Sequence, residues 1–425
     1  MSRTRRIRDP VLDSIMKQNP LSGQDNAFLN EIVRGTIRWK NRLDWIVKQR
    51  FKGKSADMPL TVRWILWLGI YQVLFTHTPP FAAVNESVNL VKQKKYMRWT
   101  GVVNGLLRNL IRHPDAVRYP NPDKDPVAYL SITQSHPEWL VKKWIKELGY
   151  QETQQLCQAN NQPAGVTLRV NPRIISEKAL IERLHQKGIQ LKSTGLSGYY
   201  HVIDNQPKVL NKFLHAGMLS IQDMSAGLPV RLIDVVPGDV ILDVCGAPGG
   251  KSAALAERWD EQCQIVSGDI SPGRSKLIES TLKRLNLQHV YPVTAAAQQF
   301  PALNVDTVLL DAPCSGLGVL QRKADIRWQR KPTDIYDLSL LQKDLINAAA
   351  SHVKPGGQLV YSTCTVLREE NEDIVHAFLT NHPEFTLKPA TNIPDDCITQ
   401  AGFVRTWPHK HAIDGSFAAK FIRKE

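Results

Sequence analysis

Residues 240–252 read VILDVCGAPGGKS, an apolar run followed at once by a loop with three glycines and a lysine. Further short apolar runs occupy residues 264–269, 305–311 and 358–362, and segments with helical spacing separate them. Short buried strands that alternate with helices are typical of a parallel sheet covered by helices on both faces. Residues 216–425 are therefore predicted to form a doubly wound α/β domain.

The loop at residues 245–251 lacks the signatures of two common nucleotide sites. A P-loop would need glycine where the chain has Cys245, and Pro248 has no N–H to offer a phosphate. The G-x-G-x-x-G pattern of NAD sites is also absent. Glycine at a strand-to-helix turn lets a ligand approach the backbone closely, and the next strand ends at Asp269, where a carboxylate can bind ribose hydroxyls. The pattern favours S-adenosylmethionine over a turn that serves packing alone.

Two cysteines follow strand ends on the expected ligand side of the sheet. Residues 311–314 read DAPC, and residues 361–364 read YSTC. An isolated cysteine is usually a small buried hydrophobe, but two thiols beside a carboxylate at strand ends favour a chemical role for Cys314, Cys364 and Asp311. The six cysteines form no C-x-x-C pair, which argues against a zinc site or a disulfide framework. No metal is predicted.

The N-terminal part of the chain is helical and basic. Apolar residues recur at spacings of three and four within residues 27–47, 62–75, 84–91 and 102–111. Residues 1–113 hold 20 Lys and Arg against 7 Asp and Glu, so almost all of the net charge of +14 lies there. We predict an all-helical domain at residues 1–120. Its charge fits either a surface for an RNA phosphate backbone or a solvated basic face.

A connecting region lies between these domains. Residues 119–126 read YPNPDKDP and are interpreted as a linker. Within residues 126–215 we predict first a helix at 136–149. A small α+β unit then follows, with a strand at 165–170, a helix at 178–187 capped by Ser176, and a return strand at 188–191.

The sequence gives no sign of membrane insertion or export. The longest apolar run, residues 64–75, is shorter than the roughly 20 residues of a membrane span. The N-terminal arginines (Arg3, Arg5, Arg6 and Arg8) are not followed by the apolar stretch of a secretory signal. A cytoplasmic protein is expected.

Taken together, the motifs resemble those of RNA cytosine-5 methyltransferases, and specifically the bacterial 16S rRNA enzymes of the RsmB (Fmu) type. The matching segments are the loop at 243–251, DAPCSG at 311–316, DIRW at 325–328, YSTC at 361–364, EENE at 369–372 and DGSF at 414–417. Residues 26–44 and 103–108 are similar to the NusB-like domain of this type.

The resemblance implies methyl transfer from S-adenosylmethionine to C5 of a cytosine in small-subunit (16S) rRNA. Cys364 would add to C6 of the base, Asp311 would hydrogen-bond N3 and the amino group, and Cys314 would assist removal of the C5 proton and release of Cys364. The implied cofactor-binding residues are Cys245, Gly246, Ala247, Pro248, Gly249, Gly250, Lys251, Asp269 and Asp311. Arg327 and Trp328 are hypothesised to contact the RNA or the flipped base, with a core position as the alternative for Trp328. No DNA or membrane partner is expected, and a monomer is the default.

The chain departs from the family pattern at three positions. Gly246 replaces an alanine, Ser416 replaces a phenylalanine, and Ala296 stands where an aspartate ordinarily reads the adenine amino group. The last change predicts weaker cofactor binding. A catalytically silent RNA-binding or ribosome-assembly protein is therefore the alternative function. A nucleotide-dependent oxidoreductase is a third reading, which lacks its fingerprint.

Overall fold

The computed structural model describes residues 10–204, 206–300 and 304–425, so the N-terminal arginines Arg3, Arg5, Arg6 and Arg8 lie outside the described residues. The chain divides into two compact units. The first comprises residues up to Gln162 together with Lys323–Gln329, and the second comprises Pro163–Arg322 and Arg330–Glu425. Within the described ranges, no helix is both long and apolar enough to cross a membrane.

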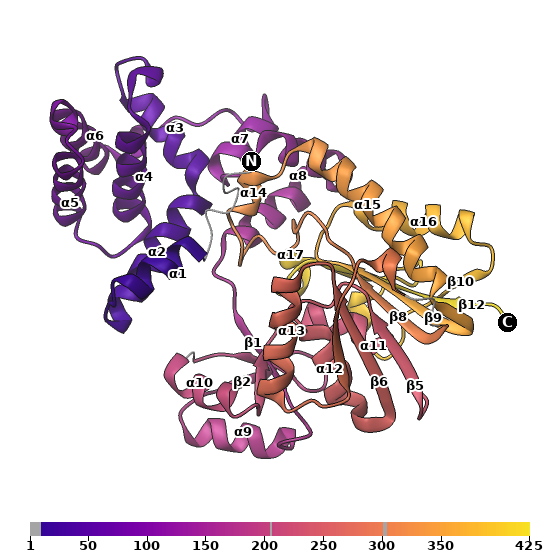
Figure 1. Ribbon diagram of the computed structural model, residues 1–425. Helices are drawn as coiled ribbons and strands as arrows, with labels where there is room; N and C mark the ends of the chain where they lie inside the picture. The colour runs from indigo at the N-terminus through magenta and orange to yellow at the C-terminus, as the bar shows by residue number, and fades with distance from the viewer. Residues whose placement is uncertain (1–9, 205, 301–303) are drawn as a thin grey trace. The chain divides into compact units, whose positions relative to one another are not determined.

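The first unit is helical, as predicted (Figure 1). Its helices are α1 (Pro10–Gln18), α2 (Gly23–Arg38), α3 (Lys40–Arg50), α4 (Leu60–Phe75), α5 (Pro80–Gln93), α6 (Thr100–Arg112), α7 (Pro126–Thr133), α8 (Glu138–Asn161) and α14 (Ile326–Gln329). The apolar faces of α3, α4 and α6 meet in one core through Leu43, Leu66 and Leu107. Helix α8 runs well past the predicted end, with a kink at Gly149, whose φ is 79°.

The segment 323–329 packs inside the first unit although its sequence neighbours belong to the second. The Arg327 side chain is 0% exposed. Its Nη1 donates to Asn161 Oδ1 at 2.8 Å, and its Nη2 donates to the Asn160 carbonyl at 3.1 Å. The Trp328 indole N–H donates to the Ile37 carbonyl at 2.7 Å. The hypothesis that Arg327 contacts RNA is therefore wrong for this structure, whereas Trp328 is half-buried and its contact with RNA stays a prediction.

The second unit begins with a small α+β module. It contains β1 (Val166–Val170), α9 (Glu177–Gln186), β2 (Leu191–Ser193), β3 (Tyr199–Val202), α10 (Pro207–His215) and β4 (Leu219–Ile221), and its antiparallel sheet has the order β2-β3-β1-β4. Ser176 caps α9 as predicted, with its Oγ 3.3 Å from the Ala179 N–H. The predicted return strand at 188–191 is wrong except at its last residue, because Gly188 (φ 76°) still belongs to the turn after α9.

The large sheet follows, and its strands are β5 (Asp239–Asp243), β6 (Cys263–Asp269), β7 (Val290–Thr294), β8 (Val305–Asp311), β9 (Val353–Thr363), β10 (Phe385–Lys388), β11 (Val404–Thr406) and β12 (Ser416–Arg423). Their order is β10-β12-β9-β8-β5-β6-β7, with β11 paired to β12. The five neighbouring strands β9, β8, β5, β6 and β7 are parallel, and β12 pairs with β9 in the antiparallel direction. The four predicted strands are confirmed, whereas β7 and the three C-terminal strands were not predicted.

Both faces of this sheet are buried, which confirms the predicted α/β class. The helices of this part of the unit are α11 (Met224–Arg231), α12 (Gly250–Trp259), α13 (Pro272–Leu285), α15 (Pro332–Ser351), α16 (Glu372–Asn381) and α17 (Pro408–His411). Neighbouring residues of β5 point to opposite faces: Ile241 packs with α12 and α13 residues, and Leu242 packs with α15 and α16 residues. Figure 1 shows α12 and α13 together on one side of the strands.

The order of the strands places a ligand site. The chain leaves β5 in one direction along the sheet, to β6 and β7, and later returns to the other side of β5 with β8 and β9. In such sheets the crevice beyond the carboxyl ends of the strands at this switch point binds ligands. The switch point lies between β5 and β8, whose last residues are Asp243 and Asp311.

Candidate active site

The glycines of the loop after β5 are required by its conformation. Gly249 has a φ of 95°, which disfavours any other residue. A Cβ on Gly246 would lie 2.2 Å from Ser267 Oγ, so the loop can approach β6 only with glycine there. The Gly246 N–H donates to the Gly268 carbonyl at 2.7 Å. The loop predicted to bind the cofactor is thus fixed against the neighbouring strand.

Asp243 is one of the residues that line a cavity next to this loop. The cavity has a volume of about 460 Å³, and its lining includes Asp243, Lys251 and Asp311. Ser252 Oγ donates to Asp243 Oδ2 at 2.6 Å. Among the described residues, Asp243 Oδ1 has no hydrogen-bond partner. Burial raises the pKa of Asp243 to about 7, so this carboxyl group changes its charge near neutral pH.

Asp269 ends β6 and faces the same loop. Its Oδ1 accepts from the Ser271 N–H at 3.0 Å, and its Oδ2 lies 3.2 Å from Arg274 Nη2. The same Arg274 nitrogen donates to the Ala247 carbonyl at 2.9 Å. Ile270, which follows, is 73% exposed. Neither Ile270 nor Arg274 was predicted as a site residue. Ile270 is a single apolar residue after a strand, and Arg274 lies in the first turn of α13, so neither belongs to a recognisable motif.

Ala296 lies two residues beyond the end of β7 and precedes a short turn of 3₁₀ helix, Ala297–Gln299. The Ala295 N–H donates to the Asp269 carbonyl at 3.2 Å, so this segment adjoins the end of β6. A carboxylate at position 296 would therefore be near Asp269. The chain offers none there.

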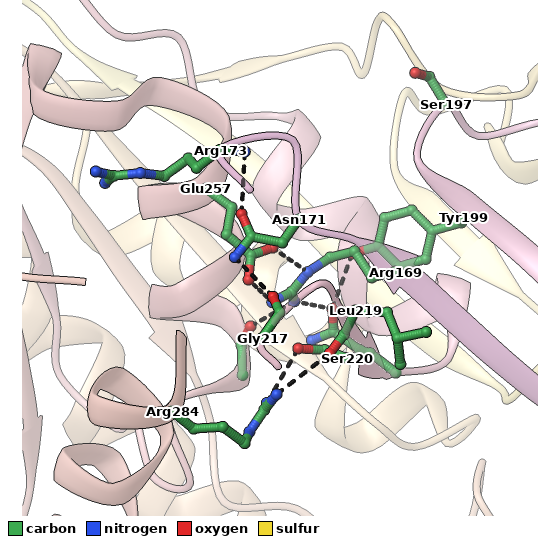
Figure 2. A network of polar contacts seen from close by, with 12 residues as sticks. Arg169, Asn171, Arg173, Ser197, Tyr199, Gly217, Leu219, Ser220, Glu257 and Arg284 are labelled. Carbon is green, nitrogen blue, oxygen red and sulfur yellow. Dashed lines mark hydrogen bonds and ion pairs between the residues drawn. The ribbon is translucent and has the colours of Figure 1, made fainter. Parts of the chain in front are cut away.

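A network behind the loop links it to the small α+β module (Figure 2). Arg169 of β1 is buried and pairs with Glu257 of α12, with N–O distances of 2.7 and 3.0 Å. Its Nη1 also donates to the Gly250 carbonyl at 2.9 Å, at the start of α12. Arg284 of α13 donates to the Leu219 carbonyl at 3.2 Å. The module thus holds the start of α12, the helix that follows the loop after β5.

The two predicted cysteines meet. Cys364 directly follows β9, and Cys314 lies three residues past the end of β8, the adjacent parallel strand. Their Sγ atoms are 3.1 Å apart, and the Cys364 N–H points at Cys314 Sγ at 3.3 Å. The hydrogen bond with Cys364, together with burial, raises the pKa of Cys314 well above its usual value.

Asp311, the last residue of β8, forms an ion pair. Lys251 Nζ is 2.6 Å from its Oδ2, and Ser362 Oγ donates to its Oδ1 at 2.9 Å. Burial lowers the pKa of Lys251, but attraction to Asp311 outweighs that effect and raises it. Lys251 thus connects the loop after β5 to the strand end that carries Asp311.

Comparison with known proteins finds related sequences over nearly the whole chain. Residues 230–422 match the family described as 16S rRNA methyltransferase RsmB/F, residues 1–112 match the NusB family, and residues 136–204 match the ferredoxin-like domain of the RsmF/B-like methyltransferases. The Probable ribosomal RNA small subunit methyltransferase B of Bacillus subtilis (strain 168) is 34% identical, over 97% of this chain and 94% of its own. This chain belongs to the RsmB/F methyltransferase family.

Other members of the RsmB/F family and a solved structure agree with this assignment. The Ribosomal RNA small subunit methyltransferase B of Cronobacter sakazakii (strain ATCC BAA-894) is 31% identical over 96% of this chain and 92% of its own. The crystal structure of PH0851 covers 97% of this chain and 93% of its own, with 25% identity and a TM-score of 0.81.

Proposed function

We propose that this RsmB/F methyltransferase transfers a methyl group from S-adenosylmethionine to C5 of a cytosine in small-subunit rRNA, through a covalent bond between Cys364 and C6 of the base. The observation that carries the proposal is the pair of cysteine sulfurs 3.1 Å apart at the carboxyl ends of two adjacent strands, beside Asp311. The names of the relatives, ribosomal RNA small subunit methyltransferase B, support the choice of substrate.

The residues around the loop after β5 fit S-adenosylmethionine. Asp269 would accept hydrogen bonds from the ribose hydroxyls, and the exposed Ile270 offers an apolar contact for the adenine. The cavity beside this loop, lined by Gly246, Ala247 and Gly250, offers space for a ligand, and the loop has no phosphate cradle. When bound, the cofactor supplies a methyl group on a positively charged sulfur, which is the electrophile that the reaction needs.

Cys364 and Asp311 would activate the base. C5 of cytosine is a weak nucleophile, and addition of the Cys364 thiolate to C6 makes it electron-rich. As the ring gains electrons, N3 becomes more basic. The Asp311 carboxylate, which lies 2.6 Å from Lys251 Nζ, would accept a hydrogen bond from the amino group and stabilise the protonated N3.

The electrostatic surroundings support the division of roles between the thiols. Lys251 lies close enough to Cys364 for the two to interact electrostatically, and a nearby cation favours a thiolate. Cys314, with its raised pKa, is suited to donate its S–H to the Cys364 sulfur. After methyl transfer, the C5–H bond breaks and its electron pair re-forms the C5–C6 double bond, while the C6–S bond breaks and Cys364 leaves as a thiolate. The C5 proton passes to a base, which is Cys314 once it has given up its own proton, or a water molecule beside it.

The basic helical part fits an RNA substrate. The surplus of Lys and Arg in residues 1–113 supports contact with phosphates. A base inside a helix cannot reach a strand-end thiol, so the target must be flipped or unpaired.

The test is transfer of labelled methyl from S-adenosylmethionine to protein-free small-subunit rRNA, followed by digestion to nucleosides. The expected product is labelled 5-methylcytidine. Labelled RNA with a different methylated nucleoside would overturn the proposal. RNA binding without transfer would favour the silent RNA-binding protein, and binding of NAD instead of S-adenosylmethionine would favour an oxidoreductase.

A further inference from the structure

Glu370 is a buried carboxylate directed at the Cys314 loop. It ends the short 3₁₀ helix Arg368–Glu370 and is 0% exposed. Its Oε1 accepts from the Ser315 N–H at 2.7 Å and from Gln342 Nε2 at 3.1 Å, and its Oε2 accepts from Ser315 Oγ at 2.6 Å. Ser315 is the residue directly after Cys314. Glu370 therefore holds both the backbone and the side chain next to one of the two thiols.

The next residue, Asn371, holds the other cysteine loop. Its Oδ1 accepts from Thr363 Oγ1 at 2.6 Å, and its Nδ2 donates to the Thr365 carbonyl at 3.0 Å. Thr363 and Thr365 are the two neighbours of Cys364 in the chain. One buried amide thus contacts both sides of the proposed nucleophile.

The two contacts are joined to each other. Ser315 Oγ and Thr365 Oγ1 are 2.8 Å apart, which links the loops directly. The hydroxyl of Tyr361, in β9, donates to the Glu370 carbonyl at 2.7 Å. This bond ties Glu370 and Asn371, which we call the clamp, to the sheet. Two adjacent residues of one short turn therefore determine where both loops lie.

We propose that Glu370 and Asn371 are positioning residues that keep the sulfurs of Cys314 and Cys364 at the separation that release of the product requires. The inference rests on the proposed function for its catalytic consequence, but its geometric content does not depend on any reaction. Both residues act through Ser315, Thr363 and Thr365, and neither needs to touch the substrate.

If Glu370 positions the loop that carries Cys314, replacements of Glu370 should differ in how far they displace that loop. Glu370→Ala leaves the buried Ser315 N–H without its acceptor and takes one partner each from the Ser315 hydroxyl and the Gln342 amide, which displaces the loop. In Glu370→Gln, the amide oxygen can replace Oε1, and the amide nitrogen can donate to Ser315 Oγ, so the geometry is kept while the charge is lost. Asp373→Asn is the matched control, because Asp373 lies on the same segment but pairs with Arg368 in an exposed ion pair.

The experiment measures oxidation of Cys314 and Cys364 to a disulfide by diamide, without RNA or cofactor, with the bond mapped by peptide mass spectrometry. Diamide takes the two electrons and two protons that the thiols lose. We expect wild type and Asp373→Asn to cross-link equally fast, Glu370→Gln to do so within about two-fold, and Glu370→Ala and Asn371→Ala to be slower by about ten-fold or more. Equal rates in all variants would overturn the inference.

Methyl transfer by the same variants measures the catalytic part. Glu370→Ala should lower kcat by about ten-fold or more with KM for RNA and cofactor within about two-fold, and Glu370→Gln should recover most of the loss. Should Glu370→Ala not fold, Ser315→Ala removes the bridging hydroxyl alone and is expected to slow both cross-linking and kcat. Wild-type protein that cross-links but transfers no methyl group would refute the proposed function and leave the clamp standing. Normal kcat in variants with slow cross-linking would refute the catalytic consequence of the clamp.

Discussion

The two ends of the candidate site differ in how completely their side chains are held. At the cysteine end, Cys314 and Cys364 are flanked by residues that Glu370 and Asn371 bind, and Asp311 has partners on both carboxylate oxygens. At the proposed cofactor end, Asp269 also has partners on both oxygens, but Asp243 Oδ1 has none within the described residues and Ala296 has no polar side chain.

This difference indicates where the chain can change without losing its activity. Groups that take part in bond making need fixed distances, so a small displacement at the cysteine end should be costly. A cofactor bound through many contacts can lose one of them and still bind at a higher concentration. The predictions below therefore run from a large expected effect at the cysteine end to a small one at the cofactor end.

Replacing the nucleophile has the largest expected effect. Cys364→Ser should lower methyl transfer by at least about a thousand-fold, because a neutral hydroxyl is a far poorer nucleophile than a thiolate. Binding of small-subunit rRNA, measured by filter retention, should be unchanged. Residual transfer at a tenth of the wild-type rate would assign the nucleophile to another residue.

Loss of the Asp311 charge should come second. Asp311→Asn removes the anion that would stabilise the protonated N3 and also leaves Lys251 without its partner. We expect kcat to fall by about a hundred-fold or more. Ser362→Ala, which removes only the 2.9 Å hydrogen bond to Asp311 Oδ1, is the milder control and should retain most of the activity. Equal losses in both variants would mean that orientation, and not charge, is what Asp311 provides.

The pH dependence of stability tests the cofactor end. The raised pKa of Asp243, about 7, means that the folded state binds this proton more tightly than the unfolded state does. Its contribution is fully present below the unfolded pKa near 4 and is lost as pH rises through 7, by about 4 kcal/mol at most. Urea unfolding from pH 5 to pH 8 should therefore show a smaller loss of stability in Asp243→Asn than in wild type. The same slope in both proteins would contradict this assignment.

Restoring a carboxylate at position 296 should have the smallest effect. Ala296→Asp would give the adenine amino group an acceptor and should tighten S-adenosylmethionine binding by about ten-fold. Calorimetric titration measures the change. Gln298→Asp adds the same charge at an exposed position two residues away and should leave the affinity unchanged. Equal gains in the two variants would show a general effect of charge.

The sequence was informative where a local pattern decides the structure. Strands β5, β6, β8 and β9 each contain a short apolar run, and the two cysteines follow the ends of β8 and β9. Strand β7 escaped prediction because it contains Pro292 and exposes Tyr291. Strand β12 did so because a buried lysine, Lys420, interrupts its apolar run and reaches Asp234 at 2.5 Å.

Local sequence patterns could not predict contacts between residues that are far apart in the chain. Arg169 finds Glu257 in a helix 88 residues away, and Glu370 finds Ser315 55 residues away. Arg327 was wrongly assigned to the RNA for the same reason, since its acceptors at Asn160 and Asn161 lie far upstream in the chain. Local periodicity predicts a helix or strand and the residues at its ends. It does not predict which buried groups from distant parts of the chain come into contact.

The central claim is that Cys364 bonds to the base and Cys314 is needed to release it. The most direct measurement is incubation of Cys314→Ser with small-subunit rRNA and S-adenosylmethionine, followed by denaturing electrophoresis and peptide mapping. We predict a stable protein–RNA complex with a methylated cytosine attached to Cys364, which is absent from Cys314→Ser/Cys364→Ser. A complex attached to another residue, or no complex although the variant binds RNA and cofactor, would contradict the account.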